Sequence, residues 1–249
     1  MDQYVVVDLE MTGLKARTDR ILEIGAVKVQ EGCITDAFHR LVNPRMEIPQ
    51  KVVELTGITN EMARSGCDTA EAVEGFLGFA GNLPLVGHNI LFDYSFLKQY
   101  AANHKMKLEK DGIDTLKLAR KFLPKAEKKT LDYLCGYLQI HRERNHRALE
   151  DAKATAVLFQ YLQEKFEARE PAAFRPEPLQ YKAKKQQPAT PRQKKYLKEL
   201  TDWHKIELNM EIDSLTRSEA SRITDKILAS HGRIPPGYDQ RDTCNAKQR

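Results

Sequence analysis

Cysteine is scarce in this chain of 249 residues, and long apolar runs are missing altogether. Its four cysteines, Cys33, Cys67, Cys135 and Cys244, are far apart and form no C-x-x-C pair, which argues against a disulfide framework and a zinc knuckle. No stretch approaches the roughly 20 apolar residues that span a bilayer. The opening "MDQYVVVDLE" lacks the basic start and apolar centre of a secretory signal. We therefore expect reduced thiols, a cytoplasmic location and no membrane partner.

Charge is distributed unevenly along the chain. Residues 1–170 contain 24 Lys and Arg against 25 Asp and Glu, whereas residues 171–249 contain 16 against 10. The basic excess therefore belongs to the C-terminal third, and it points to a polyanionic partner. The length allows one or two domains, and the composition, with 41% hydrophobic and 30% charged residues, is that of a soluble globular protein.

The first two thirds of the sequence alternate between strand and helix patterns. Three successive strand-like runs, beginning at Val5 and covering 20–29 and 34–42, predict an antiparallel meander. Alternating strands and helices then predict an α/β domain with a mixed sheet over residues 1–167. The later elements are a helix capped by Asp68 and Glu71, a strand over 83–89, a helix through Phe92 and Leu97, a strand and helix over 112–123, a helix from Thr130 and a helix over 148–166.

The remaining sequence predicts a linker, a small helical module and a tail. Residues 168–189 are rich in Pro and Lys and lack periodicity, which is typical of an extended linker. Two capping boxes, Thr190 with Gln193 and Thr216 with Glu219, begin two helices of a module over 190–232. Residues 233–249 are expected to be disordered. The expected apolar faces of the two helices are Tyr196, Leu200 and Trp203, and Ala220, Ile223 and Ile227.

Two acids stand at the end of an apolar strand in "VVVDLEMTGL". Side chains alternate along a strand, so Asp8 and Glu10 lie on the same face and repel each other unless a positive charge lies between them. Arginines elsewhere in the chain could supply that charge as ordinary salt bridges. Two further acids also have ordinary explanations, since Asp93 could be a helix-start acid and Asp151 an exposed helical acid.

The same four carboxylates could instead converge on metal ions. Oxygen ligands suit Mg²⁺ and Mn²⁺, and two such ions about 3.5–4 Å apart can hold both the attacking and the leaving oxygen of a phosphodiester. Cations would then offset the repulsion between Asp8 and Glu10.

Three sequence motifs carry a family resemblance. "DLEMTGL", "GHNILFDYSFL" and "HRALEDA" resemble, in order and spacing, the three motifs of the DnaQ-like (DEDDh) 3′→5′ exonucleases, which include polymerase proofreading exonucleases and RNase T. The resemblance covers roughly residues 1–167 and implies an RNase H-like mixed sheet flanked by helices. It further implies that Asp8, Glu10, Asp93 and Asp151 bind two Mg²⁺ or Mn²⁺ ions and that His146 is the general base.

Physical chemistry also favours a base at His146. This residue precedes Asp151 by five positions, so it can lie on the loop that enters the last helix of the domain. An imidazole, with an ordinary pKa of about 6.5, can accept a proton from an attacking water near neutrality. His141 competes for the role but fits the family motif less well. The related group with a tyrosine base would have Tyr where this chain has Arg147.

The resemblance also implies contacts with the terminal nucleotide. Phe92 could stack on a base, since an aromatic ring accepts any base, although a core position explains it equally well. We expect His88 and Asn89 to hold the loop that presents Asp93, with substrate contact by Asn89 as the alternative. The predicted substrate-binding residues are Leu9, Thr12, Gly13, Leu14, Leu55, Thr56, Asn89 and Phe92.

A basic segment follows the predicted domain. Residues 181–198, "YKAKKQQPATPRQKKYLK", contain seven Lys and Arg and no acid. We interpret them as an electrostatic contact for nucleic acid, with a solvated linker and a packing helix as the alternative. The residues in this hypothesis are Lys182, Lys184, Lys185, Arg192, Lys194 and Lys195.

Two classes of function follow from these patterns. The first is a metal-dependent 3′→5′ exonuclease that releases nucleoside 5′-monophosphates from single-stranded 3′ ends, DNA in preference to RNA. The second is a non-catalytic nucleic-acid-binding or polymerase-associated module that kept the fold. All five catalytic positions hold competent residues, which favours the enzyme. A polymerase or repair protein is a further expected partner, and the patterns leave monomer and homodimer open.

Overall fold

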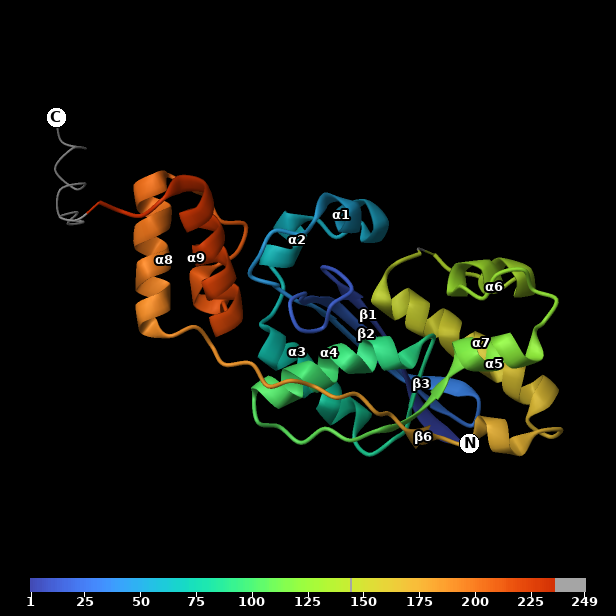
Figure 1. Cartoon of the computed structure of the whole chain (residues 1–249). Helices are drawn as coiled ribbons and strands as arrows, with labels where there is room; N and C mark the ends of the chain where they lie inside the picture. The colour runs from blue at the N-terminus through green and yellow to red at the C-terminus, as the bar shows by residue number, and fades with distance from the viewer. Residues whose placement is uncertain (144, 236–249) are drawn as a thin grey trace. The chain divides into compact units, whose positions relative to one another are not determined.

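The structure is a computed structural model that describes residues 1–143 and 145–235. The chain forms two compact units: unit 1 comprises residues 1–44 and 48–184, and unit 2 comprises residues 45–47 and 185–249. Figure 1 colours the elements of both units by residue number, from blue at the N-terminus to red at the C-terminus. Because unit 1 extends to residue 184, it continues past the predicted boundary at residue 167. The predicted tail lies outside the described residues from position 236 onward.

Unit 1 is built on a six-stranded mixed sheet with the order β3-β2-β1-β4-β5-β6. The first three strands form the predicted antiparallel meander, β4 and β5 continue the sheet in parallel, and β6 closes it in antiparallel pairing with β5. The mixed RNase H-like sheet predicted from the sequence is thus confirmed. The strands are β1 (Gln3–Met11), β2 (Ile21–Gln30), β3 (Cys33–Leu41), β4 (Leu85–Gly87), β5 (Asp111–Asp114) and β6 (Glu177–Pro178).

Helices cover both faces of this sheet because β1 is apolar on both sides. Val5, Val7 and Leu9 belong to the core cluster that contains residues of α3 and α4. Tyr4 and Val6 point the other way, into the cluster built with α5, α6 and α7. The helices are α3 (Thr69–Ala80), α4 (Ile90–Asn103), α5 (Thr115–Phe122), α6 (Leu131–Leu138) and α7 (Ala148–Phe166), and Figure 1 shows them around the strands.

Three segments of unit 1 differ from the sequence prediction. The short helices α1 (Gln50–Thr56) and α2 (Asn60–Arg64) lie where no helix was predicted. The predicted linker instead contributes the 3₁₀ helix η1 (Pro171–Phe174) and β6 to the unit. Phe174 is 2% exposed in the α7 core cluster, and it accounts for the packing of this proline-rich segment against the sheet.

Unit 2 is a pair of helices, α8 (Pro191–His204) and α9 (Arg217–His231), with the 3₁₀ turn η2 (Ile212–Ser214) in their connection. Both predicted capping boxes are present, and Gly232 ends α9 as expected. The predicted apolar face of α8 is wrong in part, because Leu197 and Leu200 form the core while Tyr196 and Trp203 remain exposed.

Three of the four cysteines lie among the described residues. Cys33, Cys67 and Cys135 are free thiols, and Cys244 lies outside the described residues. Among the residues that the structure describes, no helix is both long enough and apolar enough to cross a membrane.

Candidate active site

Asp8 and Glu10 lie on the face of β1 that packs toward α7. They share that face with Tyr4 and Val6, as the alternation of a strand requires. In the register with β2, Asp8 pairs with Gly25 and Glu10 pairs with Glu23. The next strand therefore presents a glycine and an acid to this pair.

Gly25 lets the start of α7 lie directly on the sheet. A Cβ atom at this position would be 2.1 Å from the carbonyl carbon of Ala148 and 2.1 Å from the backbone nitrogen of Leu149. No side chain fits in that space, so the backbone of α7 contacts β2 at Gly25. Asp151, in the first turn of α7, is thereby held near Asp8 and Glu10, where its charge contributes to their raised pKa values.

Asp93 reaches the same site from the other neighbour of β1. β4 pairs with β1 only at Val5 and Val6 and ends at Gly87, so β1 continues beyond its partner. The backbone N–H of Leu9 in this extension donates to Asp93 Oδ1 at 3.0 Å. Because Asp93 lies in the first turn of α4, this bond ties the helix start to the strand.

His146 completes the group from the loop before α7. One ligand atom each of Glu10, His146 and Asp151 lies within 4.8 Å of the others. His146 has a left-handed backbone with φ of 56°, and its N–H donates to Asp151 Oδ2 at 3.1 Å. Asp151 therefore fixes the loop conformation that carries the imidazole. We call Asp8, Glu10, Asp93, His146 and Asp151 the carboxylate site.

Burial raises the pKa values of the carboxylates of this site, and neighbouring carboxylates add to that rise at Asp8 and Glu10. Burial, followed by the charges of Asp93 and Glu10, holds the pKa of Asp8 well above its ordinary range. Burial and the charge of Asp151 raise the pKa of Glu10 to about 8, and burial raises the pKa of Asp93 to about 7 despite the hydrogen bond from Leu9. Such a set of oxygens needs a positive charge among them when ionised. The donor set, four carboxylates and one imidazole, fits divalent cations such as Mg²⁺ or Mn²⁺.

One arginine already contacts the site. Arg142, whose side chain is 6% exposed, donates from Nη1 to Asp151 Oδ1 at 2.7 Å and from Nη2 to Asp132 Oδ1 at 2.6 Å. Burial raises the pKa of Asp151, and the hydrogen bond and charge of Arg142 oppose that rise. No local pattern predicted a role for Arg142, since it lies in a loop nine residues before Asp151.

Glu23 and Arg147 form a second support that the sequence analysis missed. Glu23, with 0% exposure, accepts from Arg147 Nη2 at 2.6 Å and from the backbone N–H of Ala148 at 2.8 Å, and His39 Nε2 lies 2.7 Å from its Oε1. Glu23 thus caps the start of α7 from a neighbouring strand. An acid and a glycine inside the apolar run "ILEIGAVKV" were the available signal, because both are unusual in a buried strand.

Comparison with known proteins decides the family. Residues 5–159 match the exonuclease family that carries the name of RNase T. The chain belongs to this exonuclease family. The exonuclease family predicted from the three motifs is thus confirmed, and enzymes of this family use divalent metal ions.

Unit 1 resembles one part of much longer proteins. It is 41% identical over 160 residues to a DNA polymerase III of the PolC type from Clostridium perfringens, and 43% identical over 157 residues to one from Thermotoga petrophila. These matches cover 64% and 63% of this chain but only 11% of each relative. The chain therefore spans about a tenth of the length of the curated relatives that it matches.

Two solved structures share the fold of unit 1. Exonuclease X in complex with 5′ overhanging duplex DNA matches with a TM-score of 0.54 and 25% identity, over 66% of this chain and 92% of that one. The nuclease domain of 3′hExo, a DEDDh family member bound to rAMP, matches with a TM-score of 0.59 and 18% identity, over 71% and 96% of the two chains.

Some of the predicted substrate-binding side chains of unit 1 are exposed and others are buried. Leu14 is 80% exposed and Leu55 is 54% exposed, unusual values for large apolar side chains. Thr12 and Thr56 are each 4% exposed and form local hydrogen bonds. Thr12 Oγ1 accepts from the N–H of Arg20, so its side chain holds the turn after β1.

The remaining predicted contacts have structural environments. Leu9 is buried, and Phe92 is half-buried with its ring in an edge contact to Phe96 at 5.6 Å between centroids. Asn89 is exposed, has a left-handed backbone with φ of 69°, and donates its N–H to Asp114. Gly13 leaves room for Asp19, since a Cβ there would lie 2.4 Å from Asp19 Oδ2.

His88 has the structural role expected of it. Its Nδ1 lies 2.9 Å from Thr115 Oγ1, and its Nε2 lies 2.7 Å from the carbonyl oxygen of Lys129. These contacts hold the turn between β4 and α4 from which Asp93 extends.

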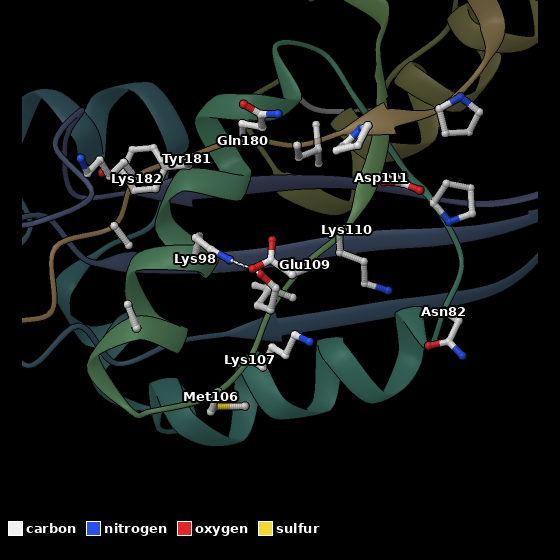
Figure 2. A pocket seen from close by; sticks show the side chains of 17 residues that line it. Asn82, Lys98, Met106, Lys107, Glu109, Lys110, Asp111, Gln180, Tyr181 and Lys182 are labelled. Carbon is white, nitrogen blue, oxygen red and sulfur yellow. Dashed lines mark hydrogen bonds and ion pairs between the residues drawn. The ribbon is translucent and has the colours of Figure 1, made fainter.

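The predicted basic residues are shared between the units. Lys182 belongs to unit 1, where it lines a hollow of about 1350 Å³ with Lys98, Lys110 and Tyr181 (Figure 2). The residues that line this hollow are distinct from those of the carboxylate site. Lys184 ends unit 1, and its backbone exchanges hydrogen bonds with the side chain of Gln99. Lys185, Arg192, Lys194 and Lys195 lie in unit 2.

Proposed function

We propose that this protein is a metal-dependent 3′→5′ exonuclease that releases nucleoside 5′-monophosphates from single-stranded 3′ ends, DNA in preference to RNA. The observation that carries this proposal is the convergence of Glu10, His146 and Asp151, with one ligand atom each within 4.8 Å of the others. Asp8 and Asp93 lie close to them, because the charges of Asp93, Glu10 and Asp151 add to the rise that burial causes in the pKa of Asp8.

The reaction assigned to this site is the hydrolysis of the last phosphodiester bond. Two divalent cations, Mg²⁺ or Mn²⁺, would stabilise the charge on the attacking and leaving oxygens. Asp8, Glu10, Asp93 and Asp151 would hold these cations. His146 accepts a proton as the water oxygen bonds to phosphorus and the bond from phosphorus to the 3′ oxygen breaks, and solvent returns a proton to that oxygen.

Contacts with the terminal nucleotide are assigned to exposed groups near the site. Leu14 and Leu55 offer apolar surface that the core of unit 1 does not use. Phe92 offers part of an aromatic ring, the exposed Asn89 offers its side-chain amide, and Gly13 is half-buried in the turn after β1. Leu9, Thr12 and Thr56 are assigned an indirect role, because they are buried or hydrogen-bonded within the fold.

The relatives of this chain support DNA as the preferred substrate. The curated matches are DNA polymerases of the PolC type, and the exonuclease X structure contains duplex DNA. The same matches support a polymerase as a partner, with a repair protein as the second candidate. The rival function, a non-catalytic module that kept the fold, is disfavoured because all five positions of the carboxylate site hold competent residues.

A digestion panel tests the proposal. Single-stranded DNA, duplex DNA, mismatched-end DNA and RNA, each labelled at the 5′ end, are incubated with Mg²⁺, Mn²⁺ or chelator. We expect stepwise shortening from the 3′ end of single-stranded DNA with either metal and none with chelator. Digestion that persists in chelator, or the absence of digestion with every substrate and metal, contradicts the proposal.

Two histidine variants sharpen this test. His146→Ala should reduce kcat by about 10²–10⁴-fold, because it removes the proton acceptor. His141→Ala is the matched control, since His141 is an exposed histidine of the same loop region and should leave kcat unchanged. Equal losses in the two variants would remove His146 from the assigned role.

A further inference from the structure

Helix α8 exposes two aromatic rings that its core does not use. Leu197, Leu200 and Thr201 are its buried residues, whereas Tyr196 is 37% exposed and Trp203 is 41% exposed. Tyr196 and Trp203 are seven residues apart, so they lie on the same side of the helix and about 10.5 Å apart along its axis. Exposed aromatic rings on one helix side are suited to stack on unpaired bases.

Cations lie beside these rings. Arg192 and Lys195 precede Tyr196 by four and one positions, and both are exposed. Arg192 shares the side of Tyr196 and Trp203, and Lys195 borders it. Glu199 lies between the rings, with Oε1 3.9 Å from Lys195 Nζ, an exposed pair of small energy. We call Arg192, Lys195, Tyr196, Glu199 and Trp203 the α8 face.

Helix α9 adds a further cation, Arg217, at the end of unit 2 where Arg192 lies. Gln193 Nε2 donates to the carbonyl oxygen of Arg217 at 3.2 Å, which joins the starts of α8 and α9. His204 Nε2 lies 3.2 Å from the carbonyl oxygen of Gly232, which joins their ends. The two helices are therefore parallel, and the exposed Arg217 lies at the end of unit 2 that carries Arg192.

We propose that the α8 face binds single-stranded nucleic acid. Phosphates contact Arg192 and Lys195, with Arg217 at the same end, and bases stack on the exposed rings. The partner follows from charge complementarity, since residues 185–198 of unit 2 contain five Lys and Arg and no acid. Such a surface raises affinity without reading the sequence, because phosphates and ring faces are common to all nucleotides.

The single tryptophan of the chain makes this inference testable by fluorescence. An oligothymidylate is titrated into full-length protein that carries Asp8→Asn and chelator, so that no digestion occurs. We expect saturable quenching of Trp203 fluorescence, with an affinity that falls steeply as salt increases. A duplex of equal length should bind more weakly, since its bases are already stacked.

Charge variants test the phosphate contacts. Arg192→Ala with Lys195→Ala should lower the slope of log affinity against log salt by about 1.4, at about 0.7 for each phosphate contact to a single strand. Lys165→Ala with Arg169→Ala is the matched control, because it removes two exposed cations from unit 1. An equal change of slope in the two double variants contradicts the inference.

Ring variants test the stacking contacts. Tyr196→Ala should weaken binding about 10-fold, and Tyr196→Phe should retain the affinity, because the aromatic face is kept. Far-UV circular dichroism checks that each variant remains folded. Equal affinity of the Ala and wild-type proteins, measured by anisotropy of a labelled oligothymidylate, overturns the inference.

These measurements separate this inference from the proposed exonuclease activity. Inactive wild-type protein that still shows salt-dependent quenching of Trp203 would refute the activity and support the α8 face. Active protein whose affinity is unaffected by changes at Arg192, Lys195 and Tyr196 would do the reverse.

Discussion

Arg147 and Glu23 form a buried ion pair that joins the start of α7 to the middle strand of the meander. The Nη2 of Arg147 donates to Glu23 Oε1 at 2.6 Å, and its Nε lies 3.1 Å from the same oxygen. Arg147 directly follows His146 in the chain. The pair therefore anchors the loop that carries the proposed base, although neither residue is assigned a contact with substrate.

Glu23→Gln should destabilise the protein and reduce its activity. The substitution removes a fully buried carboxylate and leaves the half-buried Arg147 guanidinium without its charged partner, which costs up to about 3 kcal/mol. Chemical denaturation measures the loss. Glu109→Gln is the control, because the Glu109 carboxylate pairs with Lys98 at 2.6 Å but is 66% exposed, so its loss should cost at most about 1 kcal/mol. Equal costs for the two variants would contradict a structural role for Glu23.

Asp8→Asn should abolish activity and yet stabilise the metal-free protein. The substitution removes one of the carboxylates that repel one another at the site. We expect an increase of at least about 1 kcal/mol in the free energy of unfolding in chelator, or roughly 2–4 °C in Tm. Asp2→Asn, at a carboxylate that is 94% exposed, is the control and should leave Tm unchanged. A lower Tm for Asp8→Asn would show that the carboxylate stabilises the fold.

The metal-free protein should lose stability as pH rises from about 4.5 to about 8. Glu10 has a pKa raised from its ordinary 4.5 to about 8 in the folded protein, and that of Asp93 is raised from 3.8 to about 7. The folded state therefore binds more protons than the unfolded state in this window, and its advantage is lost as pH rises through the folded pKa values. Denaturant unfolding in chelator measures this slope. Glu10→Gln should reduce it, and a slope unchanged by that variant would refute the assignment.

Leu14→Ala should impair the reaction without weakening the fold. Because Leu14 is 80% exposed, its truncation should change the free energy of unfolding by less than about 0.5 kcal/mol. If it contacts the terminal nucleotide, kcat/KM should fall about 10-fold, the loss expected for one buried apolar side chain. Val157→Ala, at an apolar residue of α7 that is 44% exposed, is the control. Unchanged kcat/KM in Leu14→Ala would remove this residue from the substrate site.

Most of the fold of unit 1 follows from local patterns. The strand through Val5 and the helix over 148–166 were predicted within a few residues, because periodicity records which face each element buries. The helices α1 and α2 were missed, since seven and five residues are too few to establish a period. In α8, Leu200 neighbours both Tyr196 and Leu197 around the helix, and spacing alone could not decide which of them is buried.

Residues of the candidate site could be predicted only where they lie in a recognisable sequence motif. Asp8, Glu10, Asp93 and Asp151 were assigned because they lie in three motifs that resemble those of a known family, whereas the apolar pattern alone left an ordinary explanation for each acid. Glu23, Gly25 and Arg142 act through contacts between distant segments, and no local pattern specifies those contacts.

Gly25→Ala should separate α7 from the sheet and thereby damage the site. The added Cβ would lie 2.1 Å from backbone atoms of Ala148 and Leu149, and backbone cannot rotate away as a side chain can. We expect a loss of about 3 kcal/mol in the free energy of unfolding. Activity should fall further than unfolding alone explains, because Asp151 and His146 move with the start of the helix.

Gly78→Ala is the matched control for this prediction. Gly78 lies in α3, and a Cβ there would have no atom within 4 Å, so the substitution should stabilise the helix by about 0.5–1 kcal/mol. Both variants are compared by denaturant unfolding and by single-turnover digestion at a temperature where both are folded. If Gly25→Ala retains wild-type turnover there, close contact between α7 and β2 is not what holds Asp151 in the carboxylate site.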